Sequence, residues 1–478
     1  MGNDNGMADI VIASNRGPIA FHRAADGAVV AARGGGGLVT GLAGLPSEGS
    51  TVWVCAALSD TDREVAAAAP GGRLDLAGHT TDPVQMLAID AETFSGAYNT
   101  ISNQVLWYVH HGLNAGKPLL PNDSREWQRD WTSYVDYNAA FADAIAAEAS
   151  DRARVLAQDY HLTVLPAMLR ARRPDLRVGL FTHTPWSTAT DFALLPAEIA
   201  NELLVGMLGA DSLGFHSPRW AEDFIDCCVR ILGAERGAGD VRYDGRSTAV
   251  RVHPLGVDPA PLLARAAQPD VAAHRAAIDA MLGDRQAIVR VDRTEPSKNI
   301  ARGLSAYRDL LERYPEHRER VVHVAIAYPS RQDIADYRHL AEEIETLAGE
   351  INDAFSTDTW TPVQLSVVND YPESLATLAA GDVALVNPIR DGMNLVAKEA
   401  TVLSDDGVLV LSRNAGAADA MGEFALLIDP FDIAGTADAL HAALVMPAAE
   451  RARRHTGLLA AATAHPPREW LRQQLDAL

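Results

Sequence analysis

The chain has 478 residues, more than one hydrophobic core usually organises, so two large domains are expected. Hydrophobic residues make up 48% of it and charged residues 22%, which argues against extensive disorder. The formal charge of -22 argues against unspecific binding to nucleic acid or to an anionic membrane, although a local basic pocket for an anionic substrate is compatible with it.

The small number of cysteines and the first residues of the chain predict where in the cell the protein is located. Cys55, Cys227 and Cys228 are the only cysteines, too few for a disulfide framework in a chain of this size. The N-terminus has no basic region followed by a long apolar stretch, and no run of about 18 apolar residues occurs. We therefore expect a soluble cytoplasmic protein without nucleic-acid or membrane partners, and a homo-oligomer remains open.

The first predicted elements are a strand and a hairpin. Ile10 to Ala13 is a short apolar run ended by Ser14-Asn15-Arg16, as expected for a parallel strand that delivers polar residues at its carboxyl end. Ile19 to Phe21 and Val29 to Ala31 predict the hairpin. The glycine run Gly34 to Gly37 follows, and glycines before a helix let backbone amides approach a phosphate. Flexible turns share this composition, so the run alone is weak evidence.

Two segments with different patterns come next. Tyr98 to His111 mixes aromatic and polar side chains outside any clear period, which is typical of a segment that lines a site, and a half-buried helix is the alternative. Trp127 to Ala147 has apolar residues at helical spacing, so we interpret it as a structural helix.

Three further predicted strands each deliver polar groups at their ends. They are Arg154 to Ala157 before Gln158-Asp159-Tyr160-His161, Arg177 to Thr182 before His183, and Ser212 to Phe215 before His216. A single histidine is more often a structural hydrogen bonder than a catalyst, but three such ends in series favour a ligand site. Strands that alternate with helices predict a doubly wound parallel sheet.

The second half restarts the same pattern after an alanine- and proline-rich stretch that ends near Gln268. A strand over Ala287 to Val291 leads to Arg293 and Lys298, and a strand over Arg320 to Ala327 leads to Arg331. We predict an N-terminal domain over 1–257 and a second Rossmann-like domain over 258–465. The amphipathic helix over 466–478 is expected to pack back on the first domain.

The stretch Asp391 to Glu399, D-G-M-N-L-V-A-K-E, follows the apolar run Val383 to Val386 and predicts a strand, a turn and a helix that starts near Asn394. It places two carboxylates beside a helix N-terminus, where one loop could hold two parts of one ligand. Acids that are solvated or cap the helix are the alternative interpretation.

The cations delivered to predicted strand ends suit an anionic ligand in a cleft between two Rossmann-like domains. They are Arg16, Arg293, Lys298 and Arg331. An arginine and a lysine five residues apart across a turn can clamp a diphosphate from two sides, in place of Mg²⁺. No compact His/Cys/Asp/Glu cluster with metal-ligand spacing is visible in the sequence, so no metal or cofactor is expected.

At this point the chain resembles a known family, the trehalose-6-phosphate synthases, which are retaining glycosyltransferases of the GT-B fold. The resemblance runs from about residue 9 to the C-terminus. The residues that carry it are Ser14-Asn15-Arg16, Gly36-Gly37-Leu38, Tyr98 with Trp107, Gln158 to Leu162, His183-Thr184-Pro185, Gly214-Phe215, Arg293 with Lys298, Ser330-Arg331 and the full Asp391 to Glu399 string.

The resemblance implies a site for a nucleotide diphosphate glucose. Arg293 and Lys298 match the family's pair on the donor diphosphate, Glu399 the carboxylate that holds the ribose, and Asp391 the group that holds the glucose hydroxyls. His183 matches the histidine beside the donor sugar. The implied donor site is completed by the phosphate loop, Gly36 and Gly37, and by Gly392, Met393, Asn394 and Leu395.

The resemblance also implies glucose 6-phosphate as the acceptor. Asp159 matches the acid that contacts it, and the pocket for its phosphate is matched by Arg16, Tyr98, Trp107 and Arg331. Two guanidiniums and a phenol can saturate phosphate oxygens. Retention in this family is usually assigned to attack on the front face of the sugar, so catalysis would be positioning and stabilisation of diphosphate charge. The implied catalytic set is Asp159, His183, Arg293, Lys298 and Asp391.

One segment departs from the family pattern. Where the family commonly reads R-L-D-Y-S-K-G, this chain reads R-T-E-P-S-K-N over Arg293 to Asn299. The variant resembles actinobacterial relatives, including pseudoglycosyltransferases that couple cyclitols, but those lose much of the Asp391 to Glu399 string. UDP-glucose and GDP-glucose are both compatible donors. Two alternatives stay open: a transferase for a cyclitol phosphate or another phosphorylated acceptor, and a non-catalytic sugar-phosphate sensor.

Overall fold

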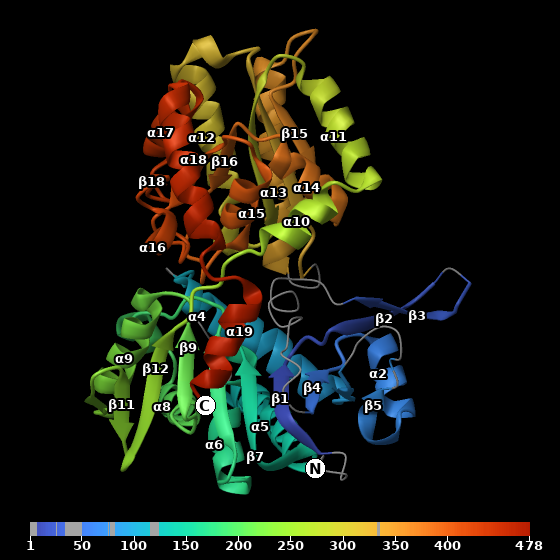
Figure 1. Cartoon of the computed structure of the whole chain (residues 1–478), viewed down its shortest axis with the longest axis vertical. Coiled ribbons are helices and arrows are strands. Elements are labelled where there is room, and N and C mark those ends of the chain that lie inside the picture. Colours follow the sequence, from blue (N-terminus) through green and yellow to red (C-terminus); the bar gives the residue numbers. More distant parts are fainter. Residues whose placement is uncertain are drawn as a thin grey trace. The chain divides into compact units, whose positions relative to one another are not determined.

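The computed structural model describes residues 7–24, 26–33, 50–74, 76, 82–114, 124–331 and 335–478 (Figure 1). The chain forms two compact units, one over Met1–Pro254 with Pro467–Leu478 and the other over Leu255–Pro466, named unit 1 and unit 2 below. The sequence analysis placed the boundary at 257, three residues later than this division. The alanine- and proline-rich stretch beyond it belongs to unit 2, where it folds as helix α10 (Pro259–Ala266).

Unit 1 is built on a ten-stranded sheet with a parallel centre. The order of the parallel strands is β12-β9-β8-β7-β1-β4-β6, so the direction of winding reverses between β1 and β7. In chain order these strands are β1 (Ala8–Ser14), β4 (Thr51–Ala56), β6 (Val84–Leu87), β7 (Ala149–Gln158), β8 (Arg177–Thr182), β9 (Ser212–Phe215) and β12 (Arg246–Val252). Antiparallel strands β5 (Arg73–Leu74), β10 (Glu235–Arg236) and β11 (Asp240–Tyr243) extend its edges.

The predicted strands and hairpin of unit 1 are confirmed. The central strands are apolar on both faces because helices cover a parallel sheet on both sides, and β4 and β9 are buried along their whole length. The hairpin is β2 (Ile19–Arg23) with β3 (Val29–Arg33), in the register that pairs Phe21 with Ala31. The longer helices are α2 (Asp60–Ala68), α5 (Ser124–Glu148), α6 (Leu165–Arg172), α8 (Ala197–Met207) and α9 (Pro218–Leu232); α7 (Ala189–Phe192) is short.

The segment Tyr98 to His111, expected to line a site, lies within a continuous helix whose middle is of the π type. α3 (Ala91–Phe94) leads into the π-helix Ser95–Leu106, and α4 (Trp107–His111) follows it. The amide of Trp107 donates to the carbonyl of Ser102, five residues back. A helix with this hydrogen-bond pattern has a longer repeat than an α-helix, which explains why the sequence shows no 3.6-residue period.

Unit 2 contains a six-stranded, fully parallel sheet of order β15-β14-β13-β16-β17-β18. Numbered along the chain this order is 3-2-1-4-5-6, that of a Rossmann fold, so the second Rossmann-like unit is confirmed. The winding reverses between β13 and β16. The strands are β13 (Gln286–Arg293), β14 (Val321–Tyr328), β15 (Val363–Ser366), β16 (Val383–Val386), β17 (Val408–Ser412) and β18 (Leu426–Ile428).

The helices of unit 2 lie before, between and after these strands in the chain. They are α10, α11 (Pro269–Leu282), α12 (Ile300–Arg313), α13 (Ala335–Phe355), α14 (Tyr371–Ala379), α15 (Leu395–Leu403), α16 (Ala418–Met421), α17 (Ile433–Leu444) and α18 (Ala448–Thr463). The last helix, α19 (Pro467–Asp476), belongs to unit 1, where it contacts β7 (Figure 1). Its Trp470 is buried, and the indole Nε1 donates to the carbonyl of His253 at 3.0 Å.

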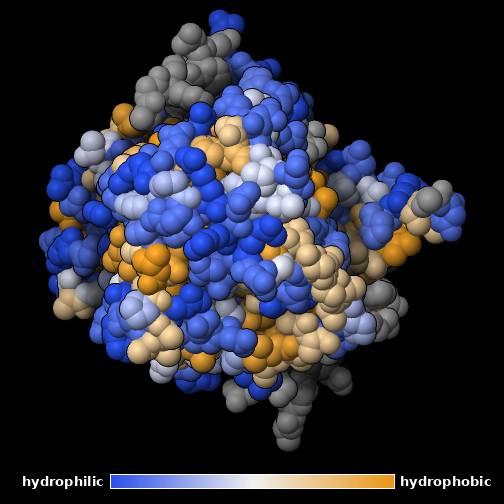
Figure 2. Space-filling model, turned by 90° about the horizontal axis from the view of Figure 1, so that it is seen from above, coloured by the Kyte–Doolittle hydropathy of each residue, from blue (hydrophilic) through white to orange (hydrophobic). Residues whose placement is uncertain are grey.

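None of the described helices is long and apolar enough to cross a membrane. The face drawn in Figure 2 is largely hydrophilic, with smaller hydrophobic areas between. All three cysteines lie in the described part, where they are buried and unpaired.

Candidate functional site

Polar side chains of unit 1 gather where the winding of its sheet reverses. In the sheet, Ser14 at the end of β1 pairs with Gln158 of β7, and Gln158 pairs with Phe181 of β8. The residues that follow these strands therefore lie at adjacent strand ends. They are Asn15 and Arg16 after β1, Asp159 after β7, and His183 after β8, with His216 following the neighbouring strand β9. Ligands of open α/β sheets bind at such a reversal.

Arg16 is placed at this edge by buried neighbours. Ser14 is fully buried, and its hydroxyl donates to the carbonyl of Arg16 at 2.7 Å while it accepts from the indole Nε1 of Trp53 at 2.7 Å. The hydroxyl of Tyr137 donates to the Asn15 side chain. The Arg16 side chain itself is exposed, so a rigid buried turn presents a guanidinium to solvent at the strand ends.

Asp159 has a strained backbone. Its φ of 73° and ψ of 171° lie in a region that is essentially restricted to glycine. The surroundings hold it there: its amide donates to the carbonyl of Phe181 at 2.6 Å, and its Oδ1 accepts from the amide of His183 at 3.1 Å. Tyr134 of α5 also fixes the turn, because its hydroxyl donates to the carbonyl of Tyr160 at 2.7 Å. Strain of this kind concentrates at functional sites.

Two substitutions at Asp159 should separate this strain from the role of the carboxylate. Asp159→Ala and Asp159→Gly both remove the carboxylate, but only glycine relaxes the backbone. We expect the glycine variant to be more stable than the alanine variant by about 1 to 3 kcal/mol. Urea denaturation of both variants measures the difference. Equal stability would show that the backbone at this position is not strained.

The imidazole of His183 is fixed by two side chains. Its Nε2 lies 2.9 Å from Gln158 Oε1, and its Nδ1 lies 3.3 Å from His216 Nε2. Since the amide oxygen can only accept, Nε2 of His183 carries the proton and Nδ1 accepts from His216. Burial lowers the pKa of His183 to about 3, so the ring is neutral near pH 7.

Trp470 is a neighbour of this histidine that the sequence analysis did not assign to the site. Its ring centroid lies 5.7 Å from that of His183 and 6.2 Å from that of His216. The sequence predicted only that the final helix docks on another surface. The spacing of Trp470 on that helix indicated that the helix docks on another surface. It did not indicate which residues Trp470 contacts.

Tyr98 and Trp107 lie on the helix that contains the π-helix. Tyr98 is half-buried, and its ring stacks between Phe94 at 5.0 Å and His161 at 5.6 Å, which places it beside the turn after Asp159. Trp107 is buried in the core of unit 1, with its ring 4.2 Å from that of His111. The packing therefore leaves the Tyr98 ring accessible and covers most of Trp107.

In unit 2 the winding of the sheet reverses between β13 and β16, and charged residues from both strand ends meet there. Lys298, in the turn after β13, places its Nζ 2.5 Å from Oδ2 of Asp391, in the turn after β16. Both side chains are about 15% exposed or less. Burial alone would lower the pKa of Lys298, but the Asp391 and Asp292 carboxylates outweigh it and raise the pKa. The ammonium is therefore charged at the reversal point.

A buried ion pair supports the turn that carries Lys298. Arg290 and Asp292 lie inside β13, with Nη2 of Arg290 2.8 Å from Oδ2 of Asp292 and 3.1 Å from the Lys298 carbonyl. Burial raises the pKa of Asp292, and Arg290 and Lys298 oppose this. The sequence analysis took this segment as an ordinary apolar strand. An arginine inside an apolar run, two residues before an aspartate, was the signal that could have revealed the pair.

The structure explains one departure from the family pattern, the asparagine at position 299. Asn299 has a left-handed backbone, with φ 60° and ψ 36°, which glycine adopts freely and asparagine tolerates. Its side chain adds contacts that glycine lacks, because Nδ2 donates to the carbonyls of Asn387 at 3.0 Å and Pro430 at 2.8 Å. Asparagine in place of glycine at position 299 therefore keeps the backbone conformation of the turn.

Arg293 is the last residue of β13, and Arg331 lies after the neighbouring strand β14. Arg293 is 55% exposed in its side chain, and its Nη1 lies 3.0 Å from Oε1 of the buried Glu295. The same oxygen accepts from the hydroxyl of Ser330 at 3.1 Å, so Glu295 ties the two strand ends together. The guanidinium of Arg331 donates to the Tyr337 hydroxyl and lies 5.5 Å from the centre of that ring.

The turn from Asp391 to Asn394 leads directly into helix α15, as the sequence predicted. Asn394 is the N-cap, and its Oδ1 accepts from the amide of Ala397 at 3.1 Å. Its Nδ2 donates to Asp391 Oδ2 at 3.1 Å, so Asp391 is held by both Lys298 and Asn394. A Cβ on Gly416 would lie 2.0 Å from the carbonyl oxygen of Gly392, so the neighbouring loop packs against this turn only because residue 416 is glycine.

Lys398 and Glu399 lie one turn into α15 and differ in their contacts and burial. Lys398 is buried, its Nζ donates to the carbonyl of Leu255 at 2.6 Å, and burial lowers its pKa to about 8. The lysine of the string is therefore a structural brace. Glu399 is half-buried, and burial raises its pKa from 4.5 to about 7. Since no cation of the described residues pairs with it, this carboxyl suits a neutral hydroxyl-bearing ligand.

The raised pKa of Glu399 makes stability depend on pH. The folded protein holds this proton more tightly than the unfolded chain, so the group's stabilising effect is complete below about pH 4.5 and is lost as the pH rises through about 7. Glu399→Gln removes the cost of ionisation. We expect its Tm, relative to the unmodified chain, to be higher at pH 8 than at pH 5. Glu312→Gln, on the exposed side of α12, is the control, and a Tm difference independent of pH would contradict the assignment.

Gly36 and Gly37, the predicted phosphate loop, lie outside the described residues. The other predicted donor-side residues, Arg293, Lys298, Glu399 and Asp391 to Leu395, lie at the carboxyl edge of the unit 2 sheet or at the start of α15. Of the predicted acceptor-side residues, Arg16, Tyr98, Trp107 and Asp159 belong to unit 1, and Arg331 to unit 2.

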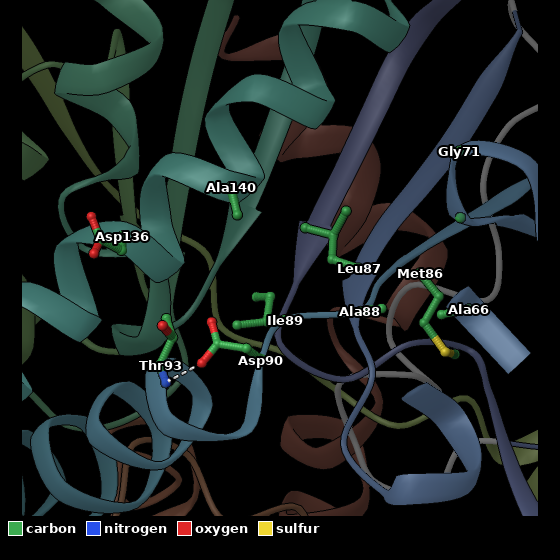
Figure 3. Close-up of a pocket in the computed structure, with 11 residues that line it drawn as sticks. Ala66, Gly71, Met86, Leu87, Ala88, Ile89, Asp90, Thr93, Asp136 and Ala140 are labelled. Atoms are coloured by element: carbon green, nitrogen blue, oxygen red, sulfur yellow. Dashed lines mark hydrogen bonds between the residues drawn. The ribbon is translucent and has the colours of Figure 1, made fainter. Parts of the chain in front are cut away.

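A pocket of about 580 Å³ in unit 1 is a separate feature (Figure 3). It is lined by Met86 to Asp90 together with residues of α2, α3 and α5, and none of the predicted site residues is among them. The two acids that line it, Asp90 and Asp136, make it unsuitable for a phosphate. Asp90 already caps α3, since its Oδ1 accepts from the amide of Thr93 at 2.9 Å (Figure 3).

Comparison with known proteins settles the family. The sequence model of glycosyltransferase family 20 matches residues 8–478. The chain belongs to glycosyltransferase family 20. A trehalose-6-phosphate synthase of Mycolicibacterium vanbaalenii is 36% identical over 490 residues, which cover 99% of this chain and 96% of that protein. An alpha,alpha-trehalose-phosphate synthase [UDP-forming] A of Dictyostelium discoideum is 32% identical over 98% of this chain, which spans 62% of that longer protein.

Two solved structures show the same fold. An E. coli protein bound with UDP-2-fluoro glucose has a TM-score of 0.85 at 30% identity, with 98% of each chain covered. An alpha,alpha-trehalose-phosphate synthase (UDP-forming) of Burkholderia xenovorans in complex with glucose-6-phosphate has a TM-score of 0.83 at 27% identity, with 98% of this chain and 99% of that chain covered. The fold of this family 20 member is therefore GT-B, with two Rossmann-like domains, as the resemblance implied.

Proposed function

We propose that this family 20 member transfers glucose from UDP-glucose to glucose 6-phosphate with retention, giving α,α-trehalose 6-phosphate. The observation that carries the proposal is the Lys298–Asp391 pair, which joins a cation and a sugar-holding carboxylate at the reversal point of a Rossmann sheet. UDP-glucose is the donor to test first, because one similar structure is bound with UDP-2-fluoro glucose and one relative is UDP-forming. GDP-glucose is the second donor.

We assign donor binding to unit 2. Arg293 and Lys298 contact the diphosphate and neutralise the charge that develops on it as the sugar leaves. Asp391 accepts hydrogen bonds from glucose hydroxyls, with the backbone of Gly392, Met393, Asn394 and Leu395 at the start of α15 beside it. The amides at a helix N-terminus favour a phosphate or a hydroxyl oxygen. Gly36 and Gly37 extend the phosphate contacts in this proposal.

Glu399 holds the ribose of the donor as an ionised acceptor of two hydroxyl groups. Its pKa of about 7 in the free protein then links donor binding to pH. Binding favours the carboxylate form, so the KM for the donor falls as the pH rises through about 7.

We assign the acceptor's phosphate to Arg16, Tyr98, Trp107 and Arg331, and its reacting region to Asp159. Guanidiniums pair with phosphate oxygens by charge-assisted hydrogen bonds, which explains selection of the phosphorylated sugar. His183 lies beside the donor glucose as a neutral ring. In front-face transfer the acceptor hydroxyl forms the new bond to the anomeric carbon as the bond to the diphosphate breaks. Its proton passes to the leaving phosphate.

A panel of donors and acceptors tests the proposal. UDP-, GDP- and ADP-glucose are each combined with glucose 6-phosphate, and the best donor is then combined with glucose and with a cyclitol phosphate. We expect turnover with UDP-glucose and glucose 6-phosphate. Turnover restricted to the cyclitol phosphate would favour a different transferase. Binding of both ligands without transfer or donor hydrolysis would favour a sensor.

A further inference from the structure

Two histidines of unit 2 that are distant in sequence meet outside the site described above. His317 ends the turn Pro315–His317 after α12, and His441 lies in the last turn of α17. Helices α12 and α17 pack side by side (Figure 1). His317 Nε2 lies 2.9 Å from His441 Nδ1, although 124 residues separate them in the chain. This separation explains why no metal-ligand spacing is visible in the sequence.

A carboxylate completes the cluster. Glu316 is exposed, His441 is half-buried and His317 is buried. One ligand atom from each of the three residues lies within 4.8 Å of the other two. Two imidazole nitrogens and a carboxylate oxygen are a ligand set that Zn²⁺ accepts, with the fourth tetrahedral position left for water.

The contact between the two rings determines what metal binding requires. In the contact between the two rings one nitrogen donates and the other accepts. For both nitrogens to bind a metal, the donating ring moves its proton to its other nitrogen. Binding therefore needs a change of tautomer and no other reactant.

The His441 ring is held in place by its neighbours. Tyr314 stacks on it, with ring centroids 4.0 Å apart and the planes 9° from parallel. The Tyr314 hydroxyl donates to Oδ1 of Asp438 at 2.7 Å, and Arg313 pairs with the same carboxylate. Support of this kind fixes the orientation of metal-binding histidines in proteins.

We propose that Glu316, His317 and His441 form a binding site for a divalent transition metal of the zinc class. The site lies just before β14, at the amino edge of the sheet, since the amide of Arg320 donates to the His317 carbonyl and β14 begins at Val321. Ligands of such sheets bind at the opposite, carboxyl edge. The metal is therefore a brace between α17 and the turn after α12, and it takes no part in the transfer reaction.

Zinc binding by the full chain tests the proposal. The protein is freed of metal with a chelator, incubated with ZnCl₂, passed through gel filtration and analysed for bound zinc. We expect one more Zn²⁺ per chain in the unmodified protein than in His441→Gln. The control His339→Gln, which replaces an exposed histidine of α13, should bind as much zinc as the unmodified protein. Equal zinc content in the unmodified and His441→Gln proteins would overturn the proposal.

Glu316→Gln provides a second measurement, because an exposed side chain can be changed with little effect on folding. We expect weaker zinc binding in this variant, seen as a smaller rise in Tm at a fixed ZnCl₂ concentration. Visible absorption of bound Co²⁺ should appear in the unmodified protein and disappear in His441→Gln. A rise in Tm that is the same in the unmodified, Glu316→Gln and His441→Gln proteins would also overturn the proposal.

Discussion

Lys298→Met is expected to lower kcat/KM by about 10²- to 10³-fold, the loss typical of removing one preorganised group that stabilises developing negative charge. In the structure this ammonium lies 2.5 Å from Asp391, at the point where the winding of the unit 2 sheet reverses. Methionine keeps an unbranched apolar side chain of similar volume and removes the ammonium group. Under the proposed function the leaving diphosphate then loses a cation that stabilises the transition state, so kcat should fall as well as donor affinity.

Lys398→Met is a matched control, because it replaces another buried lysine of unit 2. Lys398 donates to the carbonyl of Leu255, so its loss should lower Tm while kcat/KM stays within about tenfold of the unmodified enzyme. Steady-state kinetics and thermal unfolding of both variants give the comparison. If both variants lose activity in proportion to stability, Lys298 has no special role in the reaction.

Arg331→Ala is expected to raise the KM for glucose 6-phosphate by about 10- to 100-fold, because hydrogen bonds to charged groups contribute about 1.5 to 3 kcal/mol. The KM for the donor should change little. Arg331 has a left-handed backbone, with φ 43°, and its guanidinium is held by Tyr337, so the charge is preorganised. Loss of that charge weakens the phosphate contact and leaves the donor contacts in place.

The preference for a phosphorylated acceptor gives a sharper measurement. The ratio of kcat/KM for glucose 6-phosphate to that for glucose should fall in Arg331→Ala by the same factor as the KM rises. Arg308→Ala removes a half-buried arginine of α12 that pairs with Glu312, and it should leave the ratio unchanged. An unchanged ratio in Arg331→Ala would show that the acceptor's phosphate is bound elsewhere.

Much of the fold could be predicted because buried parallel strands have a simple sequence pattern. β8, β9 and β16 have the predicted bounds, since each is a short apolar run ended by a polar residue or turn. The π-helix was not predicted, because its hydrogen bonds produce a repeat that an α-helical pattern search misses. The predicted domain boundary at 257 lies three residues after the observed division, and the alanine- and proline-rich stretch forms α10 of unit 2.

Residues of the candidate site could be predicted where they directly follow a predicted strand. They could not be predicted where tertiary contacts bring them together. Asp159, Lys298 and Asp391 follow buried strands, and parallel topology brings such ends to one edge of each sheet. The contact between Trp470 and His183 joins segments that are far apart in the chain, so the sequence could not reveal it. The Arg290–Asp292 pair is local, and its signal was an arginine inside an apolar run. Asn299 has a left-handed backbone conformation, which the sequence alone did not reveal. This conformation explains why asparagine can replace the family's glycine at position 299.

The identity of the product tests the central claim most directly. The purified chain is incubated with UDP-glucose and glucose 6-phosphate, and the product is analysed by mass spectrometry and by NMR of its anomeric protons before and after phosphatase treatment. We predict a disaccharide phosphate in which both anomeric centres are α, and trehalose after dephosphorylation. A product with a β linkage, or no disaccharide phosphate with UDP-, GDP- or ADP-glucose, would contradict the account.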